Sequence, residues 1–463
     1  MTSTGSIGKK TKERDNMSIP DTSIDTDCQG SYTGNVDLAE LLSTCIDACR
    51  RGCEVIRNVR HLSLQSTDVL DSVQYKIHDD PRSALTEADG ASQKVIIECL
   101  NCCWEKEIDA GVIRIVGEED EDHYSTDLEG EKSFDTAFSE DIMSHFDNYN
   151  SPRPDFEPIQ RDMFEQTESS KHEVNSKRDE IIIFIDPMDG TREFVEGRIQ
   201  NVQCLIGITV NGMPVAGAMG MPMVHGNHIE IAYGLLSPKR NESESFVAVP
   251  LFSGVKTFDA LNPLDIQYVK QDVSCPDSTL MVFSGDSKKP ALKIAMGCLE
   301  KSVIGRVEPG NIQEADSNEG HLQPPIRKIV AGGCGNKILS VQRHFQCLSE
   351  RHNKDSSSSS SSPPMVGAIS IAPPGSSSWD TAAPTAVLLA ADPEARVTDL
   401  FGHPLIYDGE HLLNDCGVVV SSGCVASRIH ERLCEGLCND PEFCEVIGVE
   451  LEDVAPVECV EVR

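Results

Sequence analysis

The chain has 463 residues, with 40 Lys and Arg against 75 Asp and Glu, which gives a net charge of −35 at pH 7. This length suffices for one large or two medium-sized domains and excludes a disulfide-stapled mini-protein. Such a negative surface repels phosphate backbones, which weighs against nucleic acid as the main partner. The cysteines are scattered, and no stretch approaches the ~18 consecutive apolar residues of a membrane span. We therefore expect a cytoplasmic protein with reduced thiols and no membrane partner.

The first 35 residues are polar and lack periodicity, so they are expected to form a disordered lead. Apolar residues at helical spacing then predict a long helix from 36 to about 62 and a second from about 87 to 107. A short apolar run at 112–116 predicts a strand. A strongly acidic segment follows at about 121–178, which we interpret as a solvated insertion.

The middle of the chain is rich in predicted β-structure. A continuous apolar run at 181–185 predicts a buried strand, and it ends abruptly at Asp186-Pro187-Met188-Asp189-Gly190-Thr191. Segments 202–210 and 213–221 predict a hairpin, because the Asn211-Gly212 pair between them accepts the positive φ angles of a type I′ turn. An antiparallel sheet is therefore predicted here.

The last third alternates short strands, at 281–283, 326–331 and 366–372, with helices, which is typical of α/β structure. The fold class is predicted to be α/β, a layered α+β sandwich with an antiparallel-sheet N-terminal half and a smaller α/β C-terminal half. The predicted divisions are a lead at 1–35, an N-terminal domain at 36–278, a C-terminal domain at 279–440 with a serine-rich insertion at about 345–364, and a tail at 441–463.

Acidic residues follow three of the predicted strands, in Glu118-Glu119-Asp120, in the Asp186–Thr191 turn and in Trp379-Asp380. Carboxylates at the ends of neighbouring strands can converge in one crevice. Hard divalent cations such as Mg²⁺ prefer oxygen ligands of this kind. For a two-metal site, we expect the carboxylates of Glu118, Asp186, Asp189 and Asp380 within ~8 Å of one another.

Each cluster also has an ordinary structural explanation. Asp-Pro-x-Asp-Gly is common turn chemistry, and Glu118-Glu119-Asp120 can simply begin the acidic insertion. Asp380 can cap a helix that begins at Thr381. Without a metal site, all three of these ordinary explanations would have to hold at once. The combination therefore favours a shared metal site.

Two runs of the sequence resemble the paired signature of the lithium-sensitive, magnesium-dependent inositol monophosphatase superfamily: Asp186-Pro187-Met188-Asp189-Gly190-Thr191-Arg192-Glu193-Phe194-Val195-Glu196-Gly197 and Trp379-Asp380-Thr381-Ala382-Ala383-Pro384. Its bisphosphate nucleotidase branch is also similar at Gly332-Gly333-Cys334-Gly335-Asn336-Lys337. The resemblance covers about residues 36–440 and implies the layered fold of inositol monophosphatase and fructose-1,6-bisphosphatase.

The resemblance implies a site with two or three Mg²⁺ ions. Glu118, Asp186 and the Met188 carbonyl would hold one ion, and Asp186, Asp189 and Asp380 a second. Asp89 and Thr191 would orient and deprotonate the attacking water; the structural alternatives are a solvent-facing helix residue for Asp89 and a helix cap for Thr191. Substrate contacts are implied at Gly190, Thr191, Ser284, Ser287, Lys337 and Asp380.

The implied activity is phosphomonoester hydrolysis: removal of the 3′-phosphate from adenosine 3′,5′-bisphosphate, with lithium inhibition and 3′-phosphoadenylyl sulfate as a further candidate substrate. A small phosphorylated nucleotide is therefore the expected partner, and the protein is expected to be a monomer or homodimer. One loop departs from the branch pattern Arg-Ser-His-Ser: the chain has Ser284-Gly285-Asp286-Ser287, which lacks the histidine and carries an acid. An inositol polyphosphate 1-phosphatase, an inositol monophosphatase, or a catalytically silent nucleotide or ion sensor remain alternatives.

Overall fold

The computed structural model describes ten segments, residues 35–65, 74–75, 84–119, 173–175, 179–225, 228–240, 246–260, 278–304, 324–355 and 366–450. The predicted lead up to residue 34, nearly all of the acidic insertion, the serine tract at 356–362 and the last residues from 451 lie outside these segments. Within the described segments, no helix combines the length and apolar character needed to cross a membrane.

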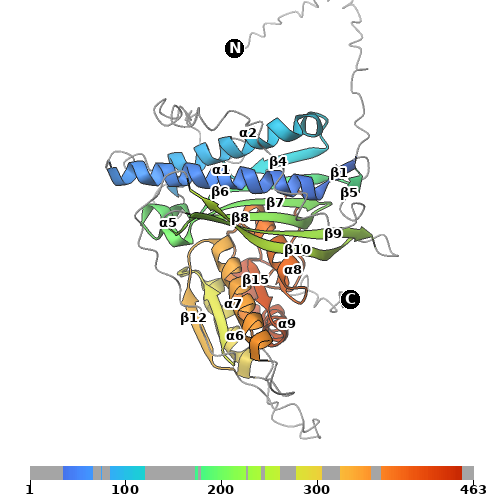
Figure 1. Ribbon diagram of the computed structural model, residues 1–463. Coiled ribbons are helices and arrows are strands. Elements are labelled where there is room, and N and C mark those ends of the chain that lie inside the picture. The colour runs from blue at the N-terminus through green and yellow to red at the C-terminus, as the bar shows by residue number, and fades with distance from the viewer. Residues whose placement is uncertain are drawn as a thin grey trace, which may run out of the picture.

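The first layer of strands is a six-stranded sheet with the order β10-β9-β8-β7-β6-β4 (Figure 1). Its strands are β4 (Ile113–Gly117), β6 (Ile181–Asp189), β7 (Gln203–Val210), β8 (Met213–His225), β9 (His228–Arg240) and β10 (Phe246–Asp259). Neighbouring strands are antiparallel except β4 and β6, which run parallel. The predicted hairpin is confirmed: Asn211 and Gly212 join β7 to β8 with φ angles of 49° and 76°.

Helices cover both faces of this sheet. Helices α1 (Leu38–Gln65) and α2 (Glu87–Asp109) pack on one face, and α8 (Ser378–Ala391) packs on the other (Figure 1). Helix α1 buries a continuous apolar stripe that includes Cys45, Cys49 and Cys53. These three cysteines are therefore part of the hydrophobic core.

A second sheet has the order β12-β11-β13-β15-β14 and follows α8 in the stack. Helices α7 and α8 cover one face, and α6 and α9 cover the other. This confirms the predicted α/β class. The elements are β11 (Leu280–Ser284), α6 (Pro290–Ile304), β12 (Ile326–Val330), α7 (Cys334–Asp355), β13 (Ala368–Ala372), β14 (Arg396–Thr398), β15 (Val418–Ser422) and α9 (Cys424–Cys438).

The remaining described elements are short: β1 (Asn35–Asp37) paired with β5 (Glu173–Asn175), β2 (Gln74–Tyr75) paired with β3 (Ala84–Leu85), α5 (Thr191–Val195), the 3₁₀ helix η5 (Ile199–Asn201) and α10 (Pro441–Ile447).

Two predicted boundaries differ from the structure. Helix α7 continues to Asp355, past the predicted start of the insertion at 345, and Leu348 on it is buried. Helix α10 lies where a tail was predicted, and its Phe443 ring packs edge-on against Phe401 at 5.4 Å between centroids. In both places apolar packing continues a helix into the predicted insertion or tail. The predicted divisions stay predictions.

Three glycines allow α8 to lie close to the first sheet. A Cβ added at Gly217 would lie 2.5 Å from the carbonyl oxygen of Ala383, and one at Gly207 would lie 2.5 Å from the Ala383 nitrogen. A Cβ at Gly234 would lie 2.7 Å from a side-chain atom of Ala390. Because these backbone contacts leave no room for a side chain, they fix the position of α8 and of Asp380 in its first turn.

We expect Gly217→Ala to lower the free energy of unfolding by about 3 kcal/mol, since the new methyl group overlaps backbone atoms of α8 that cannot rotate away. Urea denaturation followed by circular dichroism measures this change. Gly297→Ala is the matched control, because no atom lies within 4 Å of its added Cβ. Equal stability of the two variants would contradict the packing argument.

Candidate functional site

Strand β6 ends in a bulge that carries two carboxylates. Asp186 pairs with Leu205 of β7 and Asp189 with Gln203, so β6 has one residue more than its partner between these pairs. Pro187 lies in the bulge and has no N–H to offer the ladder. In a regular strand, residues three apart point to opposite faces, and one extra residue returns them to the same side.

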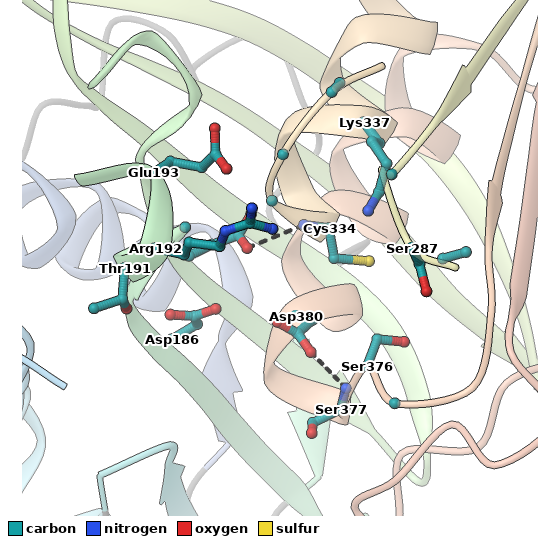
Figure 2. Close-up of a pocket in the computed structure, with 18 of the residues that line it drawn as sticks. Asp186, Thr191, Arg192, Glu193, Ser287, Cys334, Lys337, Ser376, Ser377 and Asp380 are labelled. Carbon is teal, nitrogen blue, oxygen red and sulfur yellow. Dashed lines mark hydrogen bonds between the residues drawn. The ribbon is translucent and has the colours of Figure 1, made fainter. Parts of the chain in front are cut away.

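Three carboxylates meet at this point. One oxygen from each of Asp186, Asp189 and Asp380 lies within 4.8 Å of the other two, inside the expected ~8 Å. Glu118 directly follows β4, which runs parallel to β6, and it lines the same cavity as Asp186. Figure 2 shows Asp186 and Asp380 close together, Asp380 in the first turn of its helix.

Asp380 reaches the cluster from the first turn of α8. This helix begins at Ser378 with Ser377 as its N-cap, so the prediction of a helix starting at Thr381 with Asp380 as the cap is wrong. Asp380 is instead the third helical residue, and its carboxylate accepts a hydrogen bond from the Ser377 N–H in a capping box (Figure 2). The cap therefore holds the carboxylate in a fixed orientation.

Asp189 is held by the other half of the molecule. Its Oδ1 accepts a hydrogen bond from the Cys334 N–H at 3.0 Å, and its Oδ2 accepts one from the Gly335 N–H at 2.8 Å. These are the first two residues of α7, whose N-terminus leaves N–H groups without a partner inside the helix and favours a negative charge.

Burial of several negative charges shifts the pKa values of the cluster upward. Burial raises the pKa of Asp186 well above its ordinary range, and the charges of Glu118, Asp189 and Asp380 add to this effect. Burial likewise raises the pKa of Asp189 to about 6, although the Lys337 charge and the α7 amides oppose it. Burial and the neighbouring carboxylates raise the pKa of Asp380 to about 8.

This donor set fits a hard divalent cation. Its atoms are carboxylate oxygens that repel one another when ionised, and a cation between them would remove both the repulsion and the desolvation penalty. The Met188 residue also lines the cavity, and its carbonyl oxygen lies 3.2 Å from the Thr191 hydroxyl. The residues predicted from the resemblance as metal ligands are thus gathered in one place.

Asp89 and Thr191 are joined beside the cluster. The Thr191 hydroxyl lies 2.7 Å from Asp89 Oδ1, and Asp89 Oδ2 accepts hydrogen bonds from the N–H and the hydroxyl of Thr86. Asp89 is 1% exposed, so the solvent-facing alternative is wrong. Thr191 is not the cap of α5, because Gly190 occupies that position with a φ of 92°.

The cluster lines a cavity of about 360 Å³ between the two halves of the chain. Gly190, Thr191, Ser287 and Lys337 line it as well, whereas Ser284 is not among the lining residues and is buried at the end of β11. This volume lies at the lower end of the range for small-ligand sites, which suits a nucleotide-sized molecule.

The sequence analysis assigned no role to several lining residues, notably Arg192, Glu193, Asp286 and Lys289. Arg192 and Glu193 stand inside the motif that carries the resemblance, and Asp286 stands in the loop that lacks the histidine of the branch pattern. The sequence therefore draws attention to these residues, but it does not show the contacts that they make across the cavity.

The comparisons with known proteins agree with this arrangement. Residues 37–257, which include Glu118 and the whole Asp186–Thr191 turn, match the inositol monophosphatase family. This stretch of the chain is therefore similar to that family. The third carboxylate of the cluster, Asp380, lies outside the matched residues and reaches them from α8.

Two curated relatives are 3′(2′),5′-bisphosphate nucleotidases. The Dictyostelium discoideum protein is 31% identical over 192 residues, which are 42% of this chain and 49% of that protein. The Homo sapiens protein is 41% identical over 262 residues, which are 56% of this chain and 63% of that protein. The chain therefore spans half to just under two thirds of these relatives.

Among solved structures, CysQ from Bacteroides thetaiotaomicron, described as a bacterial member of the inositol monophosphatase family, is 16% identical. The overlap covers 82% of this chain and 97% of that chain with a TM-score of 0.42.

The raised pKa values predict that metal-free protein loses stability as the pH rises from 6 to 8. The pKa values of Asp189 and Asp380, about 6 and 8, exceed the ordinary 3.8, so the folded state binds more protons than the unfolded state in this range. Differential scanning fluorimetry in a chelator should show a melting temperature several degrees lower at pH 8, and Mg²⁺ should restore it. In the Asp380→Asn variant the melting temperature should fall less between pH 6 and pH 8. An equal fall in the variant and the wild type would contradict the explanation.

Proposed function

We propose that this protein is a Mg²⁺-dependent phosphomonoesterase that removes the 3′-phosphate of adenosine 3′,5′-bisphosphate to give AMP and phosphate. The observation that carries the proposal is the Thr191–Asp89 hydrogen bond beside the carboxylate cluster. A pure binding site needs ligands for the cation but has no use for a proton acceptor placed next to them. The names of the curated relatives support the choice of a bisphosphate nucleotide.

The cation would be held by Glu118, Asp186, the Met188 carbonyl, Asp189 and Asp380. Bound there, Mg²⁺ would neutralise phosphate oxygens and make a water more acidic. The carboxylates would keep it in position from three sides, because they come from β4, β6 and α8. The capping box at Asp380 and the α7 amides at Asp189 would keep these ligands from rotating.

The proton acceptor would be Asp89, acting through Thr191. The Thr191 hydroxyl donates to Asp89 at 2.7 Å, so its oxygen can accept a hydrogen bond from a water in the cavity. As that water attacks phosphorus, its proton would pass to Thr191 Oγ1 while the Thr191 proton passes to Asp89 Oδ1. The bond from phosphorus to the ribose 3′ oxygen would break, and that oxygen would take up a proton from solvent water. Thr86 donates two hydrogen bonds to Oδ2 and so keeps Oδ1 turned toward Thr191.

The rest of the cavity would bind the nucleotide. Lys337, at the start of α7, offers a positive charge for a phosphate, and Ser287 lies on the facing loop. Lithium would compete for the same carboxylates and inhibit. Inositol phosphates are the second candidate substrates, because the loop that carries Asp286 lacks the histidine of the nucleotidase pattern.

Phosphate release should distinguish these substrates. With Mg²⁺, we expect kcat/KM for adenosine 3′,5′-bisphosphate to exceed that for inositol 1,4-bisphosphate and inositol 1-phosphate, and Li⁺ to inhibit. Asp189→Ala should lower kcat/KM at least about 100-fold, the scale of losing one group that stabilises the transition state electrostatically. Preference for an inositol phosphate would keep the catalyst and change the substrate, and no release from any of them would favour the silent sensor.

The proposed proton route predicts that Thr191→Ala lowers kcat by about 10²–10⁴-fold with little change in KM, because proton transfer is lost while the ligands remain. Thr191→Ser keeps the hydroxyl and should retain most of the activity. Melting temperatures of both variants in Mg²⁺ check that the site is intact. Equal rates for the alanine and serine variants would refute the route.

A further inference from the structure

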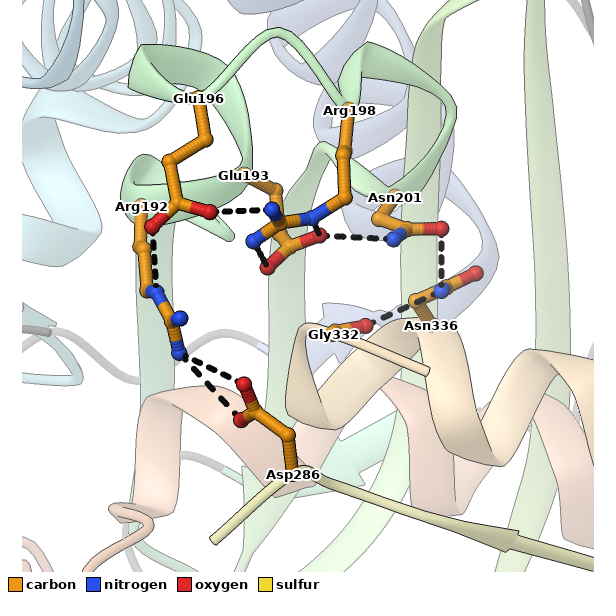
Figure 3. A network of polar contacts seen from close by, with 8 residues as sticks. All are labelled: Arg192, Glu193, Glu196, Arg198, Asn201, Asp286, Gly332 and Asn336. Carbon is orange, nitrogen blue, oxygen red and sulfur yellow. Dashed lines mark hydrogen bonds and ion pairs between the residues drawn. The ribbon is translucent and has the colours of Figure 1, made fainter. Parts of the chain in front are cut away.

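Asp286 and Arg192 form an ion pair across the mouth of the cavity. Arg192 lies on α5, and Asp286 lies in the loop between β11 and α6 (Figure 3). The Arg192 guanidinium approaches both carboxylate oxygens of Asp286, at 3.1 and 3.3 Å. Both residues line the cavity, and Arg192 Nε also donates to Glu196 at 2.8 Å. The cavity therefore has a guanidinium at its rim whose donors already face carboxylates.

We propose that Asp286 is a specificity-determining residue, which withdraws Arg192 from the substrate and so disfavours substrates with a further phosphate at this rim. The inference rests on the proposed phosphatase function and names the feature that sets its preference. Removing the Asp286 charge would free the guanidinium, whose fork of donors matches phosphate oxygens.

The charges around the cavity explain why this one pair matters. Among the lining residues that the structure describes, three are cations, which are Arg192, Lys289 and Lys337, against six carboxylates. Lys289 donates to the Pro374 carbonyl, and the charge of Lys337 acts on Asp189 and Asp380. With Arg192 also engaged, a phosphate arriving at this rim meets the Asp286 carboxylate and finds no guanidinium turned toward it.

The part of α5 that carries Arg192 is held in place by the hydrogen bonds of the next residue. The neighbouring Glu193 accepts hydrogen bonds from Arg198 at 2.6 and 2.7 Å and from Asn201 at 2.8 Å (Figure 3). Asn336 of α7 donates in turn to Asn201 at 3.2 Å. This network ties α5 to the C-terminal half and fixes the side from which Arg192 reaches the rim.

The Asp286–Arg192 ion pair contributes little to the stability of the fold. The two side chains are 60% and 30% exposed, and exposed pairs contribute little to stability because water screens them. Substitution of Asp286 should therefore leave the fold intact, and a change in substrate preference can be attributed to the rim.

The test uses the full chain with Mg²⁺ and two substrate pairs, adenosine 3′-monophosphate with adenosine 3′,5′-bisphosphate and inositol 1-phosphate with inositol 1,4-bisphosphate. For Asp286→Asn, we expect the ratio of kcat/KM, bisphosphate over monophosphate, to rise roughly tenfold in at least one pair, the scale of one charge-assisted hydrogen bond. The double variant Asp286→Asn with Arg192→Gln should return the ratio to that of the wild type.

Glu300→Gln is the matched control, because it breaks an exposed ion pair, with Lys328 at 2.6 Å, that lies outside the cavity lining. It should leave both ratios unchanged. Unchanged ratios in Asp286→Asn, or a gain that persists without Arg192, would overturn the proposal.

Isothermal titration calorimetry of the same ligand pairs separates this proposal from the proposed function. If wild-type protein releases no phosphate from any substrate, the phosphatase proposal fails. The ratio of dissociation constants still shows whether Asp286→Asn favours the ligand with the additional phosphate, and an unchanged ratio of dissociation constants refutes the role of Asp286.

Discussion

The two hydrogen bonds from the start of α7 to Asp189 have two roles. They orient a carboxylate of the site, and they join the two halves of the molecule. Asp189 belongs to the first sheet, and the Cys334 and Gly335 amides belong to the half that carries the second sheet. Because the same carboxylate also meets Asp186 and Asp380, any shift between the two halves would change the geometry of the cluster. The glycine contacts under α8 also fix the geometry of the cluster, since they hold Asp380 against the first sheet. The site is therefore as rigid as the junction between the two halves.

This arrangement destabilises the folded protein electrostatically when no cation is bound. Several carboxylates are gathered in a buried place, and burial raises the pKa values of Asp186, Asp189 and Asp380. Backbone N–H groups offset part of this cost at Asp189 and Asp380, and they do so without adding a side chain to the cavity. A divalent cation held by these carboxylates would remove the remainder, so the proposed metal binding would be coupled to folding in this region.

Local patterns in the sequence were enough to predict β4, the start of β6, the Asn211-Gly212 hairpin and the convergence of Asp186, Asp189 and Asp380, because each depends on periodicity, turn chemistry or strand ends. Strands β9 and β10, which complete the first sheet, were not predicted. Other features depend on contacts between distant residues. Lys337 was predicted as a substrate contact from the resemblance, but no local pattern shows that the N–H groups at the start of its helix bind the chain's own Asp189. Ser284 was predicted in the cavity, but the residue is buried within the second sheet. The Arg192–Asp286 pair joins residues 94 positions apart, and no local pattern encodes it.

The occupied amides at the start of α7 also constrain what a ligand can use. A helix N-terminus is a ready site for a phosphate, but here Asp189 already accepts from the first two N–H groups of that helix. The positive charge available to a substrate must then come from side chains or from the bound cation. Two of the three cationic side chains at the cavity, Arg192 and Lys289, donate to acceptors of the protein itself. In the proposed phosphatase, substrate charge would thus be matched mainly by the cation and by Lys337, and a change at the rim, where Arg192 is held by an exposed carboxylate, would alter that balance without disturbing the cluster.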